Sequence, residues 1–348
     1  MKISYSSWDK FLTCGFMYKI EKILKYEPKQ KSSALVFGSA IDEGCNDLLL
    51  GKDAEVVKEN FIKNIKKLYK TDSYYFFKND FDYDLLTEKQ EQLALGYLKD
   101  LDYEGTLDIQ TIHKTLFNKI MDNGKDYSVI SKSQQLFISC ISTMSLKQKG
   151  LMVFDAYVKK ILPQIKEVIS VQSELKTMPG FLDIKAKLLD DEIYILDNKT
   201  SSGLYSEDRI LNASQLMIYA KDENVDNIGY IVMNKNVKKN TEKTCISCGF
   251  NGNGLRHKTC PNEIDSMRCN GDWEVFITPE IEMQILLGKV DKKKQSITFE
   301  SIKSVEESIK NNIYPMNLNS CANQYGRPCS YYDYCHKGST EKIVKRSK

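Results

Sequence analysis

The middle of the chain carries apolar runs that are typical of β-strands. Strand character begins near residue 151 and continues through 167–175, 181–189 and 192–198. Residues 207–221 have the spacing of a helix, and the apolar run 227–234 predicts a buried strand. Strands followed by a helix and a further strand predict an α/β fold.

Helical periodicity dominates the N-terminal part. Residues 4–24 predict a helix that Ser6 or Ser7 caps, and residues 35–50 predict a second helix. Residues 54–150 are mostly helical in pattern and offer no obvious site. We expect them to form a helical insertion or subdomain.

Residues 181–202, FLDIKAKLLDDEIYILDNKTSS, place charges inside a predicted hairpin. Asp183 lies within the first strand, and Asp197 and Lys199 close the second. Side chains alternate along a strand, so Asp197 and Lys199 share one face. A two-residue loop would turn Asp183 to the other face. We therefore expect an odd-length loop or a bulge that places Asp183 beside Asp197.

This hairpin has the chemistry of a metal site. Two neighbouring carboxylates repel each other unless a cation lies between them, and their hard oxygens suit Mg²⁺ or Mn²⁺. Such a metal lowers the pKa of a bound water and offsets charge on a phosphate. Lys199 can orient that water or stabilise the phosphorane. The alternative is a simple ion pair of Asp197 with Lys199 or Lys185.

Four stretches together resemble one enzyme family. Gly180-x-x-Asp183 followed by Asp197-x-Lys199-Thr200 resembles the PD-(D/E)xK nuclease motif in its RecB-like form. The opening SYSSWDKFLTCGFMYKI, the stretch VFGSAIDEG and the pair Gln215-x-x-x-Tyr219 resemble three further motifs of that branch. In VFGSAIDEG, Asp42 stands where His is usual.

The resemblance implies a restriction-endonuclease-like core, with a mixed sheet flanked by helices, in a single domain of residues 1–348. It implies a metal site for Mg²⁺ or Mn²⁺ whose ligands come from Asp42, Asp183, Asp197 and the backbone carbonyl of Asn198. Asp42 as a solvated helix residue stays open.

The resemblance also assigns roles around the metal. Lys199 is the catalytic lysine, and Gln215 and Tyr219 position it or contact DNA. Helix packing is the alternative for Gln215 and Tyr219, which lie one turn apart. Glu174 on the preceding strand is a weaker candidate.

Seven of the ten cysteines follow residue 240, and the first four of these have zinc spacing. Cys245-x2-Cys248, with Cys260 and Cys269, predicts a Zn²⁺ site in a zinc-ribbon-like insertion of residues 240–275. The insertion also contains a basic group made of Arg256, His257, Lys258 and Arg268. These residues allow DNA contact. The alternative is a zinc site with a purely structural role.

Three further cysteines, Cys321, Cys329 and Cys335, lie in the C-terminal segment 315–337. AddB-like and CRISPR-associated nucleases of the RecB-like branch hold a 4Fe-4S cluster with three such cysteines and one far upstream. The resemblance implies the same cluster here, with Cys14 as the fourth ligand. Seven residues separate Cys321 from Cys329 where two are usual, so a zinc site and a group without metal both stay open.

The net charge of +3 favours no partner class. The chain has no signal-peptide pattern and no apolar run near the roughly 18 residues of a membrane span, so we expect a cytoplasmic protein with no membrane partner. The resemblance implies a metal-dependent DNA nuclease, and we expect an exonuclease acting in recombination, repair or phage DNA processing. The expected partners are single-stranded DNA or duplex ends and a separate helicase or recombination protein, because the chain lacks GxxxxGK[ST]. The alternative is a non-catalytic DNA-binding or adaptor protein built on the same fold.

Overall fold

A five-stranded mixed sheet forms the centre of the molecule. The computed structural model describes residues 2–29, 33–65, 149–322 and 328–346. The strand order is β2-β3-β4-β5-β8, in which β4 and β5 run parallel and the other neighbours are antiparallel. The chain is therefore a mixed α/β protein whose sheet is flanked by helices.

The sheet comprises β2 (Ile165–Glu174), β3 (Phe181–Leu188), β4 (Ile193–Ser201), β5 (Asn227–Cys245) and β8 (Trp273–Lys289). The longer helices are α1 (Tyr5–Thr13), α3 (Ser33–Leu49), α4 (Ala54–Ile65), α10 (Ser214–Glu223) and α11 (Lys292–Lys310). Shorter elements are α2 (Gly15–Tyr18), the π-helix Lys19–Ile23, the 3₁₀ turns Leu162–Gln164 and Leu318–Ser320, α9 (Glu207–Leu211), α12 (Tyr332–Lys337), β1 (Tyr26–Pro28), β6 (Glu263–Ile264), β7 (Met267–Arg268) and β9 (Ile343–Lys345).

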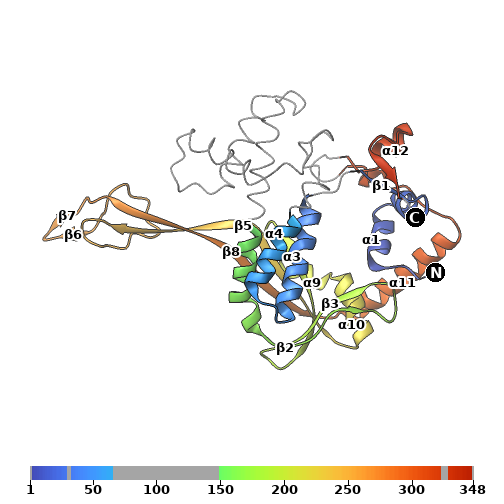
Figure 1. The fold of residues 1–348 in the computed structure, drawn as a ribbon, viewed down its shortest axis with the longest axis horizontal. Helices are drawn as coiled ribbons and strands as arrows, with labels where there is room; N and C mark the ends of the chain where they lie inside the picture. The colour runs from blue at the N-terminus through green and yellow to red at the C-terminus, as the bar shows by residue number, and fades with distance from the viewer. Residues whose placement is uncertain (1, 30–32, 66–148, 323–327, 347–348) are drawn as a thin grey trace.

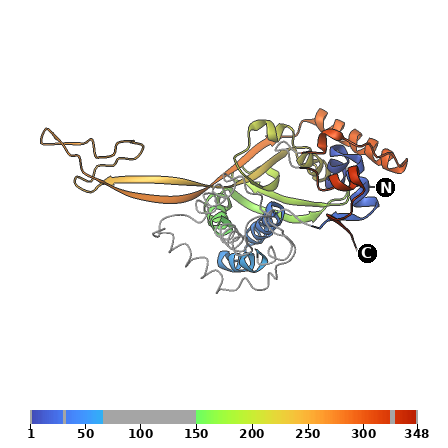
Figure 2. The same cartoon turned by 90° about the horizontal axis from the view of Figure 1, so that it is seen from above.

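Helices cover both faces of the sheet, and each face has its own apolar core (Figure 2). On one face, α3, α4 and the helical residues 149–160 pack around Leu196 and Ile231. On the other face, α1, α10 and α11 pack around Ile195 and Val232. Consecutive strand residues thus enter opposite cores, as the pleat requires.

The β3–β4 hairpin has the odd-length loop that its sequence predicts. Ile184 pairs with Leu196, and the Leu188 N–H donates to the Glu192 carbonyl at 3.1 Å, which leaves a three-residue loop. Asp191, the last loop residue, has a left-handed backbone (φ 67°), as expected in a three-residue hairpin loop. The register places Asp183 on the same face as Asp197.

Three predictions of local structure are wrong in part. Residues 149–160 are helical rather than extended. Their buried positions Val153, Phe154 and Tyr157, with Ile161 just beyond, follow helical spacing rather than the alternation of a strand. The predicted helix 207–221 is broken into α9 and α10. The cap of α1 is Ser4, whose Oγ accepts from the Ser7 N–H, so neither Ser6 nor Ser7 caps it.

A two-stranded arm projects from the core (Figure 1). Strands β5 and β8 continue their antiparallel pairing beyond the sheet to Cys245 and Trp273, and the tip carries the β6–β7 hairpin. The predicted insertion 240–275 is therefore the outer part of a longer ribbon whose strands begin in the core.

The two ends of the chain lie together at the opposite end of the molecule from the arm (Figure 1). Strand β1 pairs with β9, and Tyr331 and Ile343 bury against Ile20. The predicted helical segment 54–150 begins as α4, and its residues 66–148 lie outside the described ones. None of the helices in the described ranges is long and apolar enough to cross a membrane.

Candidate active site

Three carboxylates and a lysine meet in one pocket of about 500 Å³. Its polar lining includes Asp42, Asp183, Asp197, Asn198, Lys199, Thr200 and Gln215. These residues come from α3, β3, β4 and α10, of which α3 is far from the other three in the sequence. The predicted metal and catalytic residues are thus brought together, except Tyr219, which contacts the pocket through Gln215, and Glu174, which is exposed elsewhere on β2.

Asp197 is the most deeply buried of the three acids. It is only 2% exposed, and its Oδ2 atom lies 2.5 Å from Lys199 Nζ. This ammonium group pairs with Oδ2, and no further hydrogen-bond donor reaches that oxygen among the described residues. Burial of a carboxylate is costly unless its oxygens are fully paired. Lys199 offsets part of this cost and a metal ion at the carboxylate oxygens would offset more, so these hard oxygen ligands fit Mg²⁺ or Mn²⁺.

The electrostatics of the pocket point the same way. Burial and the neighbouring Asp197 charge raise the pKa of Asp183 to about 7. Burial also raises the pKa of Asp197, and burial followed by the Asp183 charge raises that of Asp42. These raised pKa values are what a divalent cation would reverse, because a hard cation stabilises the charged forms of neighbouring carboxyl groups.

Lys199 is held from two sides. Burial opposes its positive charge, but the carboxylate of Asp197 outweighs burial and raises its pKa. Lys199 Nζ also donates to Gln215 Oε1 at 3.4 Å, and the Gln215 amide donates to the Tyr219 hydroxyl at 2.8 Å. The predicted positioning of the lysine by the α10 pair is therefore present as a hydrogen-bonded chain.

Asp42 is positioned by amides rather than left in solvent. Asn198 Nδ2 donates to Asp42 Oδ1 at 3.3 Å, and Asn46 Nδ2 donates to Asp42 Oδ2 at 3.2 Å. The fully buried Tyr157 hydroxyl in turn donates to Asn198 Oδ1 at 3.3 Å. The side chain of Asn198 thus connects the helical layer beneath the sheet to the pocket.

Several residues that support the site could not be recognised from sequence patterns. Gln172 donates to Asp183 Oδ1 at 3.1 Å from a left-handed backbone (φ 52°) in the irregular strand β2. Tyr157 and Asn46 lie on helices whose other residues are ordinary core residues. Only the fold shows that their polar atoms face the site.

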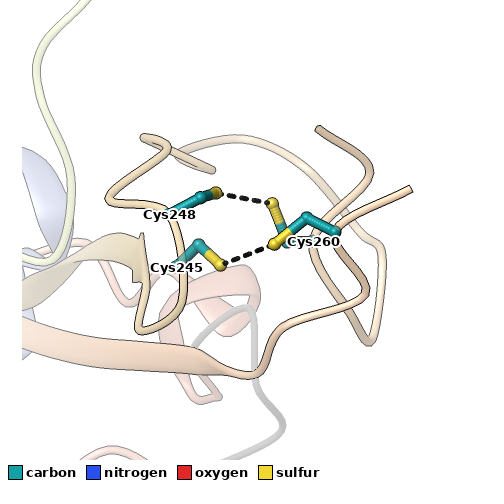
Figure 3. Close-up of side chains that lie close together, drawn as sticks. Cys245, Cys248 and Cys260 are labelled. Atoms are coloured by element: carbon teal, nitrogen blue, oxygen red, sulfur yellow. Dashed lines mark hydrogen bonds between the residues drawn. The ribbon is translucent and has the colours of Figure 1, made fainter. Parts of the chain in front are cut away.

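A second candidate site lies at the tip of the arm. Cys245 and Cys248 face Cys260 across a small space (Figure 3), and Cys269 completes the group. The four sulfur atoms all lie within 4.8 Å of one another. The distances are 3.7 Å for Cys245–Cys269 and 3.6 Å for Cys248–Cys260. This group can bind one metal ion.

The four remaining predicted ligands gather where the chain ends meet. Cys329 and Cys335 interact electrostatically with each other and with Cys14 and Cys321. The backbone N–H of Asn317 points to Cys14 Sγ, and that of Tyr331 points to Cys329 Sγ, both at 3.5 Å.

These four sulfur atoms lie further apart than those of the arm, because they do not all come within 4.8 Å of one another. Exposed His336 lies 3.5 Å from Cys321 Sγ. Cys45 is buried and contacts Met233, as a core residue does, and Cys140 lies outside the described residues.

The sequence of the chain matches no protein-family model and no curated protein.

Proposed function

We propose that this protein is a metal-dependent DNA nuclease that hydrolyses phosphodiester bonds at the pocket between β3, β4, α3 and α10. The observation that carries the proposal is the meeting of Asp183, Asp197 and Lys199 on one face of the β3–β4 hairpin. A simple ion pair of Asp197 with Lys199 would not explain why Asp183 and Asp42 line the same pocket.

The site's own residues divide into holding and positioning groups. Asp42, Asp183, Asp197 and the carbonyl of Asn198 would hold Mg²⁺ or Mn²⁺. When bound, such an ion supplies a water of lowered pKa and positive charge beside the phosphate.

Lys199 has the second role at the reacting phosphate. Its ammonium group pairs with Asp197 and donates to Gln215, and Lys199 lines the pocket. It orients the attacking water or donates to a phosphate oxygen as negative charge develops there. Tyr219 acts through Gln215 and is a positioning residue.

The topology supports a PD-(D/E)xK core of the RecB-like branch. Such a core needs the acidic hairpin, a parallel strand reached through a helix, and a helix that brings a further ligand. Here these are β3–β4, the α10 crossover to β5, and α3 with Asp42. The opening serines serve this core locally, since Ser4 caps α1.

The two cysteine groups would hold different metals. Tetrahedral zinc with Zn–S bonds of about 2.3 Å separates its sulfur ligands by about 3.8 Å, close to the spacing in the arm. A 4Fe-4S cluster spaces its cysteines more widely, because each binds its own iron atom, and it accepts hydrogen bonds at its sulfur ligands. The looser set of Cys14, Cys321, Cys329 and Cys335 suits that cluster.

The test is an incubation of purified protein with linear single-stranded and duplex DNA, with Mn²⁺ or with a chelator. We expect cleavage only with the metal and no cleavage by Asp197→Asn. Asp190→Asn, in the hairpin loop and away from the pocket, is the matched control and should cleave like the wild type.

The same experiment separates the nuclease from the adaptor alternative. DNA binding without metal-dependent cleavage in the wild type would favour a non-catalytic DNA-binding or adaptor protein. Equal cleavage by wild type and Asp197→Asn would place any activity outside this pocket.

A further inference from the structure

A second lysine, Lys235, lines the active-site pocket. It lies on β5, the strand parallel to β4, at the point where β5 leaves the core sheet for the arm. Ser201 at the end of β4 pairs with Asn234, so Lys235 follows the last paired residue. Lys235 therefore lies at the rim of the pocket, on the strand next to the one that carries Lys199.

The backbone at Lys235 is irregular in a way that aims this side chain. Between the Met233–Met283 and Val237–Ile281 pairs, three residues of β5 stand opposite the single residue Glu282. Such bulges redirect side chains and are frequent beside active sites.

Hydrogen bonds on both sides of Lys235 fix the bulge. Asn234, 7% exposed, donates to Glu282 Oε2 at 3.3 Å and accepts from the Asn236 N–H at 3.0 Å. The Asn236 amide reaches the Ser202 carbonyl beyond β4 at 2.5 Å. The bulge is therefore a built feature, and Lys235 projects from its centre.

Lys235 is the lysine of this region without an acidic partner. Lys199 is paired with Asp197, and Lys238 with Glu282 at 3.1 Å. The side chain of Lys235 has no hydrogen bond or ion pair with any other residue in the described ranges. Lys235 is half-buried, lines the pocket of three carboxylates and pairs with none of them, so its ammonium group is available to a ligand.

The net charge of the pocket indicates which kind of ligand Lys235 would bind. Three carboxylates and two ammonium groups give the ionised pocket one net negative charge. One divalent cation changes this to one net positive charge, which matches the single negative charge of a phosphodiester. Without Lys235, the same pocket with cation and phosphodiester would keep an uncompensated negative charge.

We infer that Lys235 binds a phosphate of the polynucleotide strand that lies in this pocket. The inference rests on the proposed nuclease function. The contact is a point charge on a flexible stem, so it positions the strand without reading its sequence. The bulge of β5 makes the arm's root part of the substrate-binding surface.

Variants of Lys235 test this inference through the salt dependence of DNA binding. Binding of short labelled DNA is measured at several salt concentrations in Ca²⁺, which shares the oxygen preference of Mg²⁺. Lys235→Met should weaken binding about tenfold. The log–log salt slope should become shallower by about 0.9 on duplex or 0.7 on single-stranded DNA. The loss should be equal for unrelated sequences.

Two further variants make the result specific. Lys238→Met removes the same charge three residues along the strand and should keep the wild-type slope. Lys235→Arg keeps the charge and should restore it. A wild-type slope in Lys235→Met, or an equal decrease in Lys238→Met, would overturn the inference while metal-dependent cleavage by the wild type still stands. Absence of both DNA binding and cleavage in the wild type would overturn the inference and the proposed function together.

Discussion

Tyr157 donates a hydrogen bond of 3.3 Å to Asn198, and both side chains are buried beneath the active-site pocket. The bond links the helix of residues 149–160 to the residue between Asp197 and Lys199. Through the other end of the Asn198 amide, the same link reaches Asp42. A residue of the helical core therefore fixes the orientation of a proposed metal ligand.

Tyr157→Phe should weaken both stability and function. It leaves Asn198 Oδ1 buried without its donor, and the free energy of unfolding should fall by about 1–3 kcal/mol, as measured by urea denaturation. Release of Asp42 should also lower the affinity for Mn²⁺. Tyr194→Phe, whose hydroxyl bonds to the surface residue Asp190, is the control and should retain Mn²⁺ affinity. Equal Mn²⁺ affinity in both variants would remove Tyr157 from the support of the site.

Gln172 should act on the metal through Asp183. Residues that hold a metal ligand typically contribute about 10-fold or more to affinity, so Gln172→Gly should weaken Mn²⁺ binding by about this factor in a calorimetric titration. Glycine keeps the left-handed backbone, so the loss reports the hydrogen bond rather than strain. Gln164→Ala, in the 3₁₀ turn just before β2, should have no effect. Unchanged affinity in Gln172→Gly would contradict the assignment.

The raised pKa of Asp183 predicts an unusual pH dependence when no divalent cation is added. The unfolded chain releases this proton near pH 4, whereas the folded protein keeps it up to about pH 7. Between these values the folded state binds more protons, so this group's contribution to the free energy of unfolding falls as pH rises. Comparison of urea denaturation from pH 4 to 7 should show the loss in wild type and a smaller one in Asp183→Asn.

Added Mn²⁺ should reverse that trend, because the ion competes with the proton at Asp183 and binds more tightly as pH rises. Asp208→Asn, an exposed acid on α9, is the charge-matched control and should behave as the wild type does. If Asp183→Asn and Asp208→Asn gave the same pH profile, the raised pKa of Asp183 would be wrong.

The two cysteine groups should lose their metals independently. Cys248→Ser should remove zinc and keep iron, and Cys329→Ser should remove iron and its visible absorbance and keep zinc. Elemental analysis of anaerobically purified protein measures both. Ser247→Ala, between the knuckle cysteines, should keep both metals. Loss of zinc from Cys329→Ser would assign zinc to the chain-end group instead.

Loss of zinc should also loosen the arm tip, because its loops have few buried apolar residues besides the thiolates. Limited proteolysis of Cys248→Ser should cut between residues 245 and 273 while the core sheet remains intact. Proteolysis of the core at the same rate would show that the arm and the sheet unfold together.

The sequence was informative where side-chain alternation decides geometry. The Asp183–Asp197–Lys199 face, the odd-length loop, the Gln215–Tyr219 pair and the spacing of the arm cysteines follow from local periodicity. Lys235 and Gln172 could not be found in this way, because a bulge and a left-handed backbone aim them. The long pairing of β5 with β8 depends on contacts between distant segments. The strand predicted near residue 151 was wrong because the apolar residues there follow helical spacing.

The most direct test of the central claim compares metal binding with cleavage in Lys199→Gln. In the proposed function Lys199 assists the reaction without binding the metal, so the variant should bind Mn²⁺ with an affinity near that of the wild type. Its single-turnover rate of DNA cleavage should fall by about 100-fold or more. Cleavage by Lys199→Gln at the wild-type rate, with Mn²⁺ bound, would contradict the account.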